Sequence, residues 1–233
     1  TNRVNADAYK DVALNLVRQR KWMFNASNPA ALAVAEVNRL PCLAIDEPKL
    51  YSLPTVAKSQ WLRELHLDGS LMDDDQQESF LGGADDDFKP YVQLAISRLP
   101  PQLVVFSCSY LGLQVMPTLP DSLEELVWEE NATRSFHRRL AGPLPSSLKT
   151  LRVNIIIRKR LGHRHTDAGF LHFLDLPELP PSLEGLNIDY SPQRNSTLPQ
   201  LPPALQHLSC YGARLTHLPP LPSLLVSLNC TAN

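Results

Sequence analysis

The chain lacks several features that would place it in common functional classes. None of its stretches reaches the roughly 18 consecutive apolar residues of a membrane-spanning helix, so we expect no membrane span. The formal net charge is only −2, which gives no general attraction to nucleic acid or to anionic membranes. The 9 glycines form no phosphate-binding loop, and no Gly-x-Ser-x-Gly or Cys-x-x-Cys motif occurs. We therefore expect neither a nucleic-acid partner nor a cofactor.

Proline is abundant instead, with 21 residues, and the prolines stand in register with leucines. The phrase Leu-Pro-x-x-Leu-x-x-Leu or a close variant begins at Leu99, Leu119, Leu144, Leu179, Leu201 and Leu221. Successive starts are 20, 25, 35, 22 and 20 residues apart. The segment "WLRELHLDGS" from Trp61 keeps the Leu-x-x-Leu-x-Leu core without the Leu-Pro. Repetition at this period is the signature of a solenoid.

The spacing within each unit indicates its structure. Leu-x-x-Leu-x-Leu ends in strict alternation, which is the period of a β-strand. A unit of about 20 residues is too short for a helical repeat and fits the leucine-rich repeat. Proline prevents the return segment from continuing as a helix. The sequence therefore predicts an α+β solenoid of short leucine-rich repeats, with a parallel concave β-sheet and an extended, polyproline-like convex side.

The first part of the chain does not follow the repeat, and we divide the chain into a helical cap (1–58) and the repeats (59–233). Apolar residues with helical spacing indicate a first helix, namely Tyr9, Val12, Ala13, Leu16 and Val17. A second helix is predicted at "NPAALAVAEVNRL", with Asn28 as its N-cap, Pro29 at its first position and Pro41 stopping it. A solenoid needs such a cap because its end would otherwise expose the core.

Two inserts interrupt the rhythm of the repeats, an acidic one at about 72–94 and a basic one at about 156–176. Insertions in repeat arrays form loops on one face, so the inserts are either solvated loops or added recognition surface. The sequence starts without an initiator Met or a signal segment and stops at Asn233 inside a repeat. We expect more of the natural protein to follow.

The four cysteines are predicted to be structural. Cys108, Cys210 and Cys230 share a column with inward apolar residues of other repeats, and Cys42 follows the second helix. Free cysteine behaves as a small buried apolar residue, so we expect the three column cysteines to be buried and reduced. A reducing compartment agrees with this usage.

A metal-dependent hydrolase is the alternative that the sequence leaves open. The string "GHRHTD" places His163, His165 and Asp167 at alternate positions of the basic insert, where two imidazoles could bind one metal. Metallohydrolases with this spacing have a further His after the Asp, whereas Ala168 stands there. We therefore predict no metal site, with these three residues as the weak candidate.

A binding module is the main hypothesis, because a solenoid usually acts through its surface. The residues that alternate with the inward leucines should lie on the concave face. They are Glu64, His66, Asp68, Ser107, Ser109, Glu125, Val127, Glu129, Arg152, Asn154, Asn187, Asp189, Ser209, Tyr211 and Asn229. The face is acidic toward its N-terminal half, which favours a protein partner with a basic docking surface.

The phrase Leu-Pro-x-Leu-Pro-x-x-Leu-x-x-Leu resembles the LPX-type leucine-rich repeats of bacterial type III secreted effectors. It is seen in "LPQLPPALQHL" (198–208) and "LPPLPSLLVSL" (218–228), and in a close variant at 175–186. The resemblance is to the IpaH and YopM types and covers about residues 97–233. It implies secretion into the host cell cytoplasm and recognition of a host protein. It further implies either substrate binding for an E3 ubiquitin ligase domain outside this chain or a YopM-like scaffold without enzymatic activity.

Overall fold

The computed structural model describes residues 24–25, 29–46, 56–69, 99–111, 115–131, 137–140, 142–156, 173–191, 193 and 196–233. Their main sheet contains β1 (Phe24–Asn25), β2 (Cys42–Asp46), β3 (Glu64–Asp68), β4 (Val105–Ser109), β6 (Glu125–Asn131), β8 (Thr150–Ile156), β10 (Gly185–Asn187), β11 (His207–Ser209) and β12 (Ser227–Asn229). Three further strands, β5 (Val115–Met116), β7 (His137–Leu140) and β9 (Phe173–Asp175), form a second sheet. The helix of the described chain is α2 (Pro29–Asn38).

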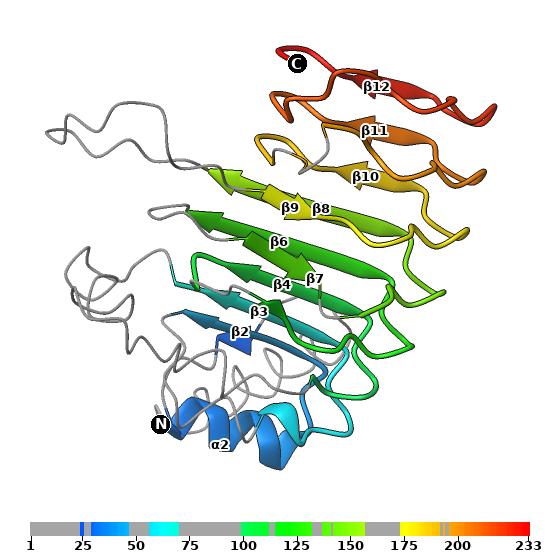
Figure 1. Cartoon of the computed structure of the whole chain (residues 1–233). Helices are drawn as coiled ribbons and strands as arrows, with labels where there is room; N and C mark the ends of the chain where they lie inside the picture. Colours follow the sequence, from blue (N-terminus) through cyan, green and yellow to red (C-terminus); the bar gives the residue numbers. More distant parts are fainter. Residues whose placement is uncertain are drawn as a thin grey trace, which may run out of the picture.

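The main sheet is parallel throughout and its strands are stacked in chain order (Figure 1). Each strand hydrogen-bonds with the strand of the next unit, while β5, β7 and β9 leave the order to build the second sheet. The described chain is therefore a β-solenoid, as the repeat predicts, with its core between the strands and the return segments.

The leucine phrase forms inward columns that run across the main sheet. In one column Leu65 pairs with Phe106, which pairs with Leu126, and the next inward column contains Cys108 beside Trp128. All five side chains are buried. Neighbouring units thus bury each other's apolar side chains, because the strand period of two turns mainly apolar residues to this side. Glu130 is the exception on β6: it is buried beside Trp128, whose Nε1 donates to Glu130 Oε1 at 3.3 Å.

Each Leu-Pro-x-x-Leu segment is a turn that leads into the following strand. The proline carbonyl accepts a hydrogen bond from the backbone N–H of the leucine three residues later, at 3.2 Å for Pro100–Leu103 and 3.0 Å for Pro120–Leu123. The same bond recurs at the units that begin at Leu144, Leu179, Leu201 and Leu221. Proline fits because its fixed φ suits a turn and its missing N–H is not required there.

A serine in three of these turns ties one unit to the preceding one. Ser122 Oγ donates to the carbonyl of Leu103 at 2.7 Å, and Ser147 Oγ donates to that of Leu123 at 2.6 Å. Ser182 Oγ does the same to the carbonyl of Leu148 at 2.8 Å. A hydroxyl that satisfies a carbonyl near the core avoids the cost of leaving that acceptor unpaired.

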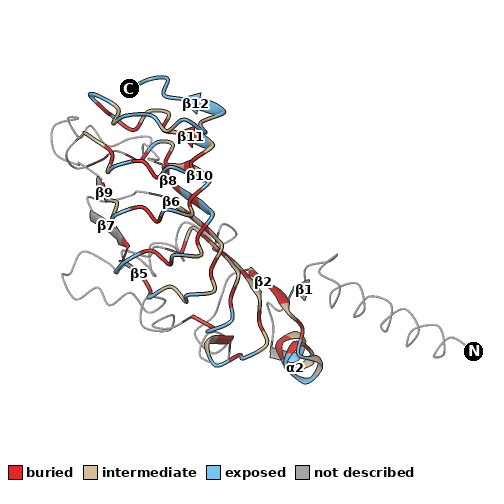
Figure 2. Ribbon diagram, turned by 90° about the vertical axis from the view of Figure 1, so that its right-hand side faces the viewer, coloured by how far each residue is buried: buried red, intermediate tan, exposed pale blue. Residues whose placement is uncertain are grey.

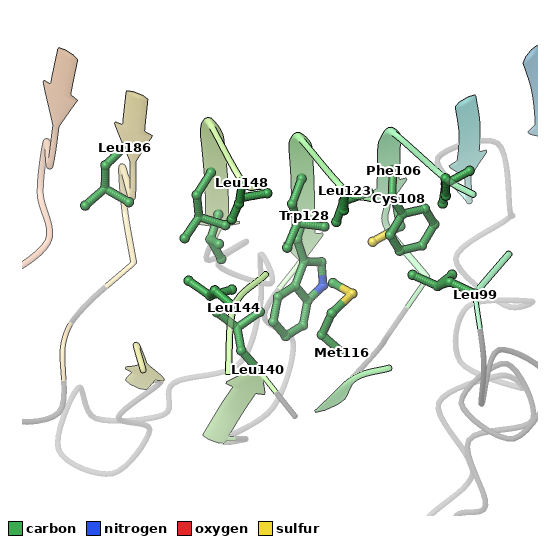
Figure 3. Close-up of a cluster of buried hydrophobic side chains, with 14 of the residues drawn as sticks. Leu99, Phe106, Cys108, Met116, Leu123, Trp128, Leu140, Leu144, Leu148 and Leu186 are labelled. Carbon is green, nitrogen blue, oxygen red and sulfur yellow. The ribbon is translucent and has the colours of Figure 1, made fainter. Parts of the chain in front are cut away.

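The side opposite the main sheet is extended, and part of it is itself a sheet. In the second sheet β7 lies between β5 and β9, and all pairs are parallel. Figure 3 shows Met116 and Leu140 reaching from this side toward Trp128, and all three residues belong to the buried core. The prolines of the repeat predict an extended, polyproline-like return limb, but the pairing of these strands has no signal in the repeat.

The N-terminal described residues continue the main sheet. Leu43 and Ile45 of β2 pair with Leu65 and Leu67 of β3, so β2 repeats the inward pattern. The N–H groups of Arg63 and Glu64 donate to the carbonyl of Pro41, a bond pattern that recurs between later units. The sheet therefore begins before residue 59, where the sequence analysis starts the repeats. The core of "LPCLAID" stands 22 residues before that of β3, a normal repeat spacing, but helix α2 takes the place of the leading Leu-Pro turn, so the phrase is not recognisable.

Helix α2 spans the residues that the sequence predicts for the second helix, and it ends with a left-handed residue. Arg39 has a φ of 49°, and the N–H of Leu40 bonds to the carbonyl of Ala35 at 3.0 Å, which is a Schellman-type ending. Leu32 and Ala35 are buried in the core, whereas Val37 is exposed. The predicted first helix lies outside the described residues.

The cysteines correct one prediction. Cys42, Cys108 and Cys210 are buried, but Cys230 is exposed. Its strand β12 is the last in the sheet order and pairs only with β11, so no neighbour covers its other edge. Figure 2 shows this end of the stack in the colour of exposed residues. A position in the inward column is therefore not enough to bury a cysteine. The side chain also needs a further unit stacked on its own, as Cys108 and Cys210 have.

Candidate functional site

The side of the main sheet that faces away from the core, here called the outer face, carries the polar residues of the strands. Glu64, His66 and Asp68 alternate along β3 with buried Leu65 and Leu67, and the same alternation holds along β4, β6, β8, β10 and β11. The three residues of β12 are all exposed. The outer face is defined by the residues that the sequence analysis assigns to binding: Glu64, His66, Asp68, Ser107, Ser109, Glu125, Val127, Glu129, Arg152, Asn154, Asn187, Asp189, Ser209, Tyr211 and Asn229. The structure places each of them at a half-buried or exposed position.

The same columns contain residues that sequence reasoning overlooked. They are Ala44, Asp46, Val105, Thr150, Gly185, His207 and Ser227. Asp46 pairs in register with Asp68, which extends the acidic column into β2. Asn25 donates to the carboxylate of Asp46 at 2.5 Å and so connects it to β1. A search for Leu-x-x-Leu-x-Ile without the leading long phrase would have found the β2 residues.

The acidic residues predicted to share a face lie closer together than the sequence indicates. Only β4 separates β3 from β6. Glu64 and Glu125 therefore flank Val105 in one column, and Asp68 and Glu129 flank Ser109 in another. Two strand spacings place the paired backbones about 10 Å apart, near the screening length at physiological salt. These two pairs of carboxylates together produce a negative potential on this part of the outer face.

His66 lies among these carboxylates. Burial of the imidazole lowers the pKa of His66 from its ordinary value, while the charges of Glu64 and Glu125 act in the opposite direction. Desolvation disfavours the protonated ring. The imidazole therefore does not supply a fixed positive charge at neutral pH that would cancel the acidic columns.

Asn154 connects the acidic part of the outer face with β8. Its Nδ2 donates to Glu129 Oε1 at 3.3 Å, while its Oδ1 is buried and has no partner among the described residues. Arg152 on the same strand is exposed. The positive charge of Arg152 thus remains accessible on the otherwise acidic surface.

A hydrogen-bond network orders the outer face at β10, β11 and β12. Asp189 Oδ1 accepts from Ser209 Oγ at 2.7 Å and from the N–H of Tyr211 at 2.8 Å. Ser209 Oγ also accepts from Asn229 Nδ2 at 3.3 Å. These side chains join three consecutive units, so the polar surface here is held in place rather than freely solvated.

An ion pair lies beside the first column. Lys149 Nζ is 2.7 Å from Glu124 Oε2, and both side chains are about half exposed. The hydrogen bond to Glu124, together with its charge, raises the pKa of Lys149. Exposed pairs of this kind contribute little to stability, so its main effect is to neutralise one carboxylate near the outer face.

The alternative site falls outside the described residues. His163, His165 and Asp167 belong to the basic insert, and the whole acidic insert at about 72–94 lies outside the described residues as well. Among the described residues no three His, Cys, Asp or Glu side chains are grouped so that they could hold a metal ion. The described part of the chain also contains no helix with the length and hydropathy needed to span a bilayer.

Comparisons with other proteins do not assign this site. No protein-family model, no curated protein and no solved structure matches the chain.

Proposed function

We propose that this chain is a protein-recognition module that binds a partner with a basic surface through the outer face. The observation that carries the proposal is the register of β3, β4 and β6, which brings Glu64, Asp68, Glu125 and Glu129 onto one surface. The negative potential of these carboxylates increases the association rate of basic partners and disfavours acidic ones.

The repeat phrase supports a narrower version of this proposal. We infer that the units are leucine-rich repeats of the LPX type, and that the chain is the host-target recognition part of a bacterial type III effector. It would then act in the reducing cytoplasm of a host cell. Free buried Cys42, Cys108 and Cys210 are compatible with that compartment.

Two versions of this proposal differ in what happens to the host protein after it binds. In an IpaH-like effector, the outer face would select the substrate of an E3 ubiquitin ligase domain outside this chain. In a YopM-like effector, binding alone would be the activity. In both versions we propose that this chain contributes recognition and no catalytic residue.

The test is a charge reversal on the outer face. Glu125→Lys/Glu129→Lys should slow association with a partner identified by cross-linking several-fold at low salt, with a smaller effect at high salt. Both side chains are only half buried, so the fold should be kept. The matched control is Asp121→Lys/Glu178→Lys, which makes the same charge change at exposed positions outside the strands.

Stopped-flow or surface plasmon resonance with the purified partner gives the association rate constants. Circular dichroism and thermal unfolding check that each variant is folded. Equal slowing by both double variants would mean that only net charge matters. An unchanged rate for Glu125→Lys/Glu129→Lys would place recognition elsewhere and overturn the proposal.

A further inference from the structure

Two tyrosines and a carboxylate meet at the edge of the outer face, just after β10 and β11. The ring centroids of Tyr190 and Tyr211 are 5.1 Å apart and the rings are inclined by 68°, which is an edge-to-face pair. Asp189 precedes Tyr190 in the chain, and its carboxylate bonds to the backbone of Tyr211. We call Asp189, Tyr190 and Tyr211 the tyrosine–aspartate cluster.

The backbone holds Tyr190 in an unusual position. Its φ is 56°, a left-handed conformation that non-glycine residues rarely adopt, and its N–H donates to the carbonyl of Tyr211 at 2.7 Å. The ring also lies beside Gly212, where an added Cβ would be 3.5 Å from Tyr190 Cδ1. Tyr190 is nevertheless 52% exposed. An aromatic ring is thus placed against the end of the next strand while much of it stays open to solvent.

The carboxylate of Asp189 is held in place through one of its two oxygens. Both hydrogen bonds that the Asp189 carboxylate accepts reach Oδ1, from Ser209 Oγ and from the N–H of Tyr211. Within the described chain its Oδ2 accepts no hydrogen bond. One anionic oxygen of an oriented carboxylate therefore remains available close to the exposed ring.

This combination suits a cationic side chain. A guanidinium or ammonium group is attracted to the face of a tyrosine ring, and a neighbouring carboxylate adds a charged hydrogen-bond acceptor. Arginine fits best, because its planar group can stack on a ring and donate to a carboxylate at once.

We propose that the tyrosine–aspartate cluster is an anchor for one arginine side chain of the partner. The inference rests on the proposed function, in that it names the group of a basic partner that this end of the outer face recognises. The anchor lies just after β10 and β11, whereas Glu125 and Glu129 lie on β6. The two can therefore be tested separately.

The probe is the peptide acetyl-Gly-Arg-Gly-amide, and its uncharged control contains citrulline in place of arginine. Spectra of the whole chain with carbon-13-labelled tyrosine rings report on Tyr190 and Tyr211. The arginine peptide should shift both ring signals saturably at millimolar concentration. The citrulline peptide should bind at least about threefold more weakly, because it lacks the charge that the ring and the carboxylate attract.

Two variants test the members of the cluster. Asp189→Asn keeps an oxygen that can accept from Ser209 and Tyr211, so it removes the charge while preserving the turn. Tyr190→Leu removes the exposed ring, with Tyr211 as the reporter. Each should weaken arginine binding about threefold or more. The matched control is Tyr110→Leu. Tyr110 has the same turn position, with a φ of 57°, but its N–H donates to the carbonyl of Glu129, whereas that of Tyr190 donates to the carbonyl of a second tyrosine, Tyr211.

Tyr110→Leu should leave the response of Tyr190 and Tyr211 unchanged. Equal or unsaturable shifts with the arginine and citrulline peptides would overturn the anchor. So would wild-type affinity in both Asp189→Asn and Tyr190→Leu. The proposed function would survive that result if Glu125→Lys/Glu129→Lys still slows the partner. If the peptide binds as expected but that double variant changes nothing, the anchor stands and the acidic columns are not the recognition surface.

Discussion

Individual side chains in this protein have properties that depend on the unit that contains them. Cys108, Cys210 and Cys230 occupy the same inward column, yet their environments differ. Burial raises the pKa of the Cys108 thiol well above its ordinary range, with the charges of Glu130 and Glu129 adding to the effect. Burial also raises the pKa of Cys210 to about 11. Thiols in such settings react slowly, because the thiolate is the reactive form and the reagent lacks access.

We predict that one of the four thiols reacts rapidly with a chromogenic disulfide reagent at pH 8 in the folded protein. That thiol is Cys230, because it is exposed. All four should react in denaturant. Cys230→Ser should abolish the rapid phase, whereas Cys210→Ser should leave it unchanged. Rapid reaction of two or more thiols in the native protein would contradict the described burial.

At the scale of the element, each strand is stabilised by the units on either side of it. Leu208 of β11 is 2% exposed, whereas Leu228 is 41% exposed. The two leucines are direct partners in the sheet and differ only in whether another strand follows. The same residue type at the same repeat position therefore makes different contributions to stability.

Alanine substitution at these two positions measures that difference. Leu208→Ala should lower the free energy of unfolding by about 2–5 kcal/mol, because it opens a cavity in the core. Leu228→Ala should lower it by less than about 1 kcal/mol, since much of the side chain is already in water. Urea denaturation followed by circular dichroism gives both values. Equal losses would mean that β12 is covered in solution.

At the scale of the whole molecule, the N-terminal described residues extend the main sheet and the core. β2 pairs with β3, and Leu32, Ala35 and Leu40 join the common core. Removal of this part would expose the edge of β3 together with Leu62, Leu65 and Leu67, which are now at most 2% exposed. An open strand edge beside apolar side chains favours association between chains.

We predict that a chain lacking residues 1–55 self-associates and melts at a lower temperature than the whole protein. A point-variant pair gives a milder version of the test. Ala35→Asp should destabilise the protein because it buries a charge in the core. Val37→Asp should be nearly neutral, because Val37 is 83% exposed on the same helix. Light scattering and thermal unfolding measure both effects, and a monomeric truncated chain of unchanged melting temperature would contradict the prediction.

Much of the fold follows from local sequence, whereas the candidate site follows only in part. The leucine spacing predicts which side of each strand is buried, and thereby which residues reach the outer face, from Glu64 to Asn229. It does not reveal the neighbours of β3, because a long insert separates β3 from β4 in the chain. The short separation of Glu64 and Glu125 across the sheet is therefore a tertiary finding. The edge-to-face pair of Tyr190 and Tyr211 is another, since it depends on the turn after β10.

The sequence by itself determined the parallel stacking of short units, because period-two alternation and the Leu-Pro turn act within about ten residues of chain. Only the tertiary structure decided that the return side contains a second sheet and that Cys230 is exposed. These two outcomes depend on which segment lies beside another. Such neighbours are set by contacts between residues far apart in the chain, and a local pattern carries no information about them.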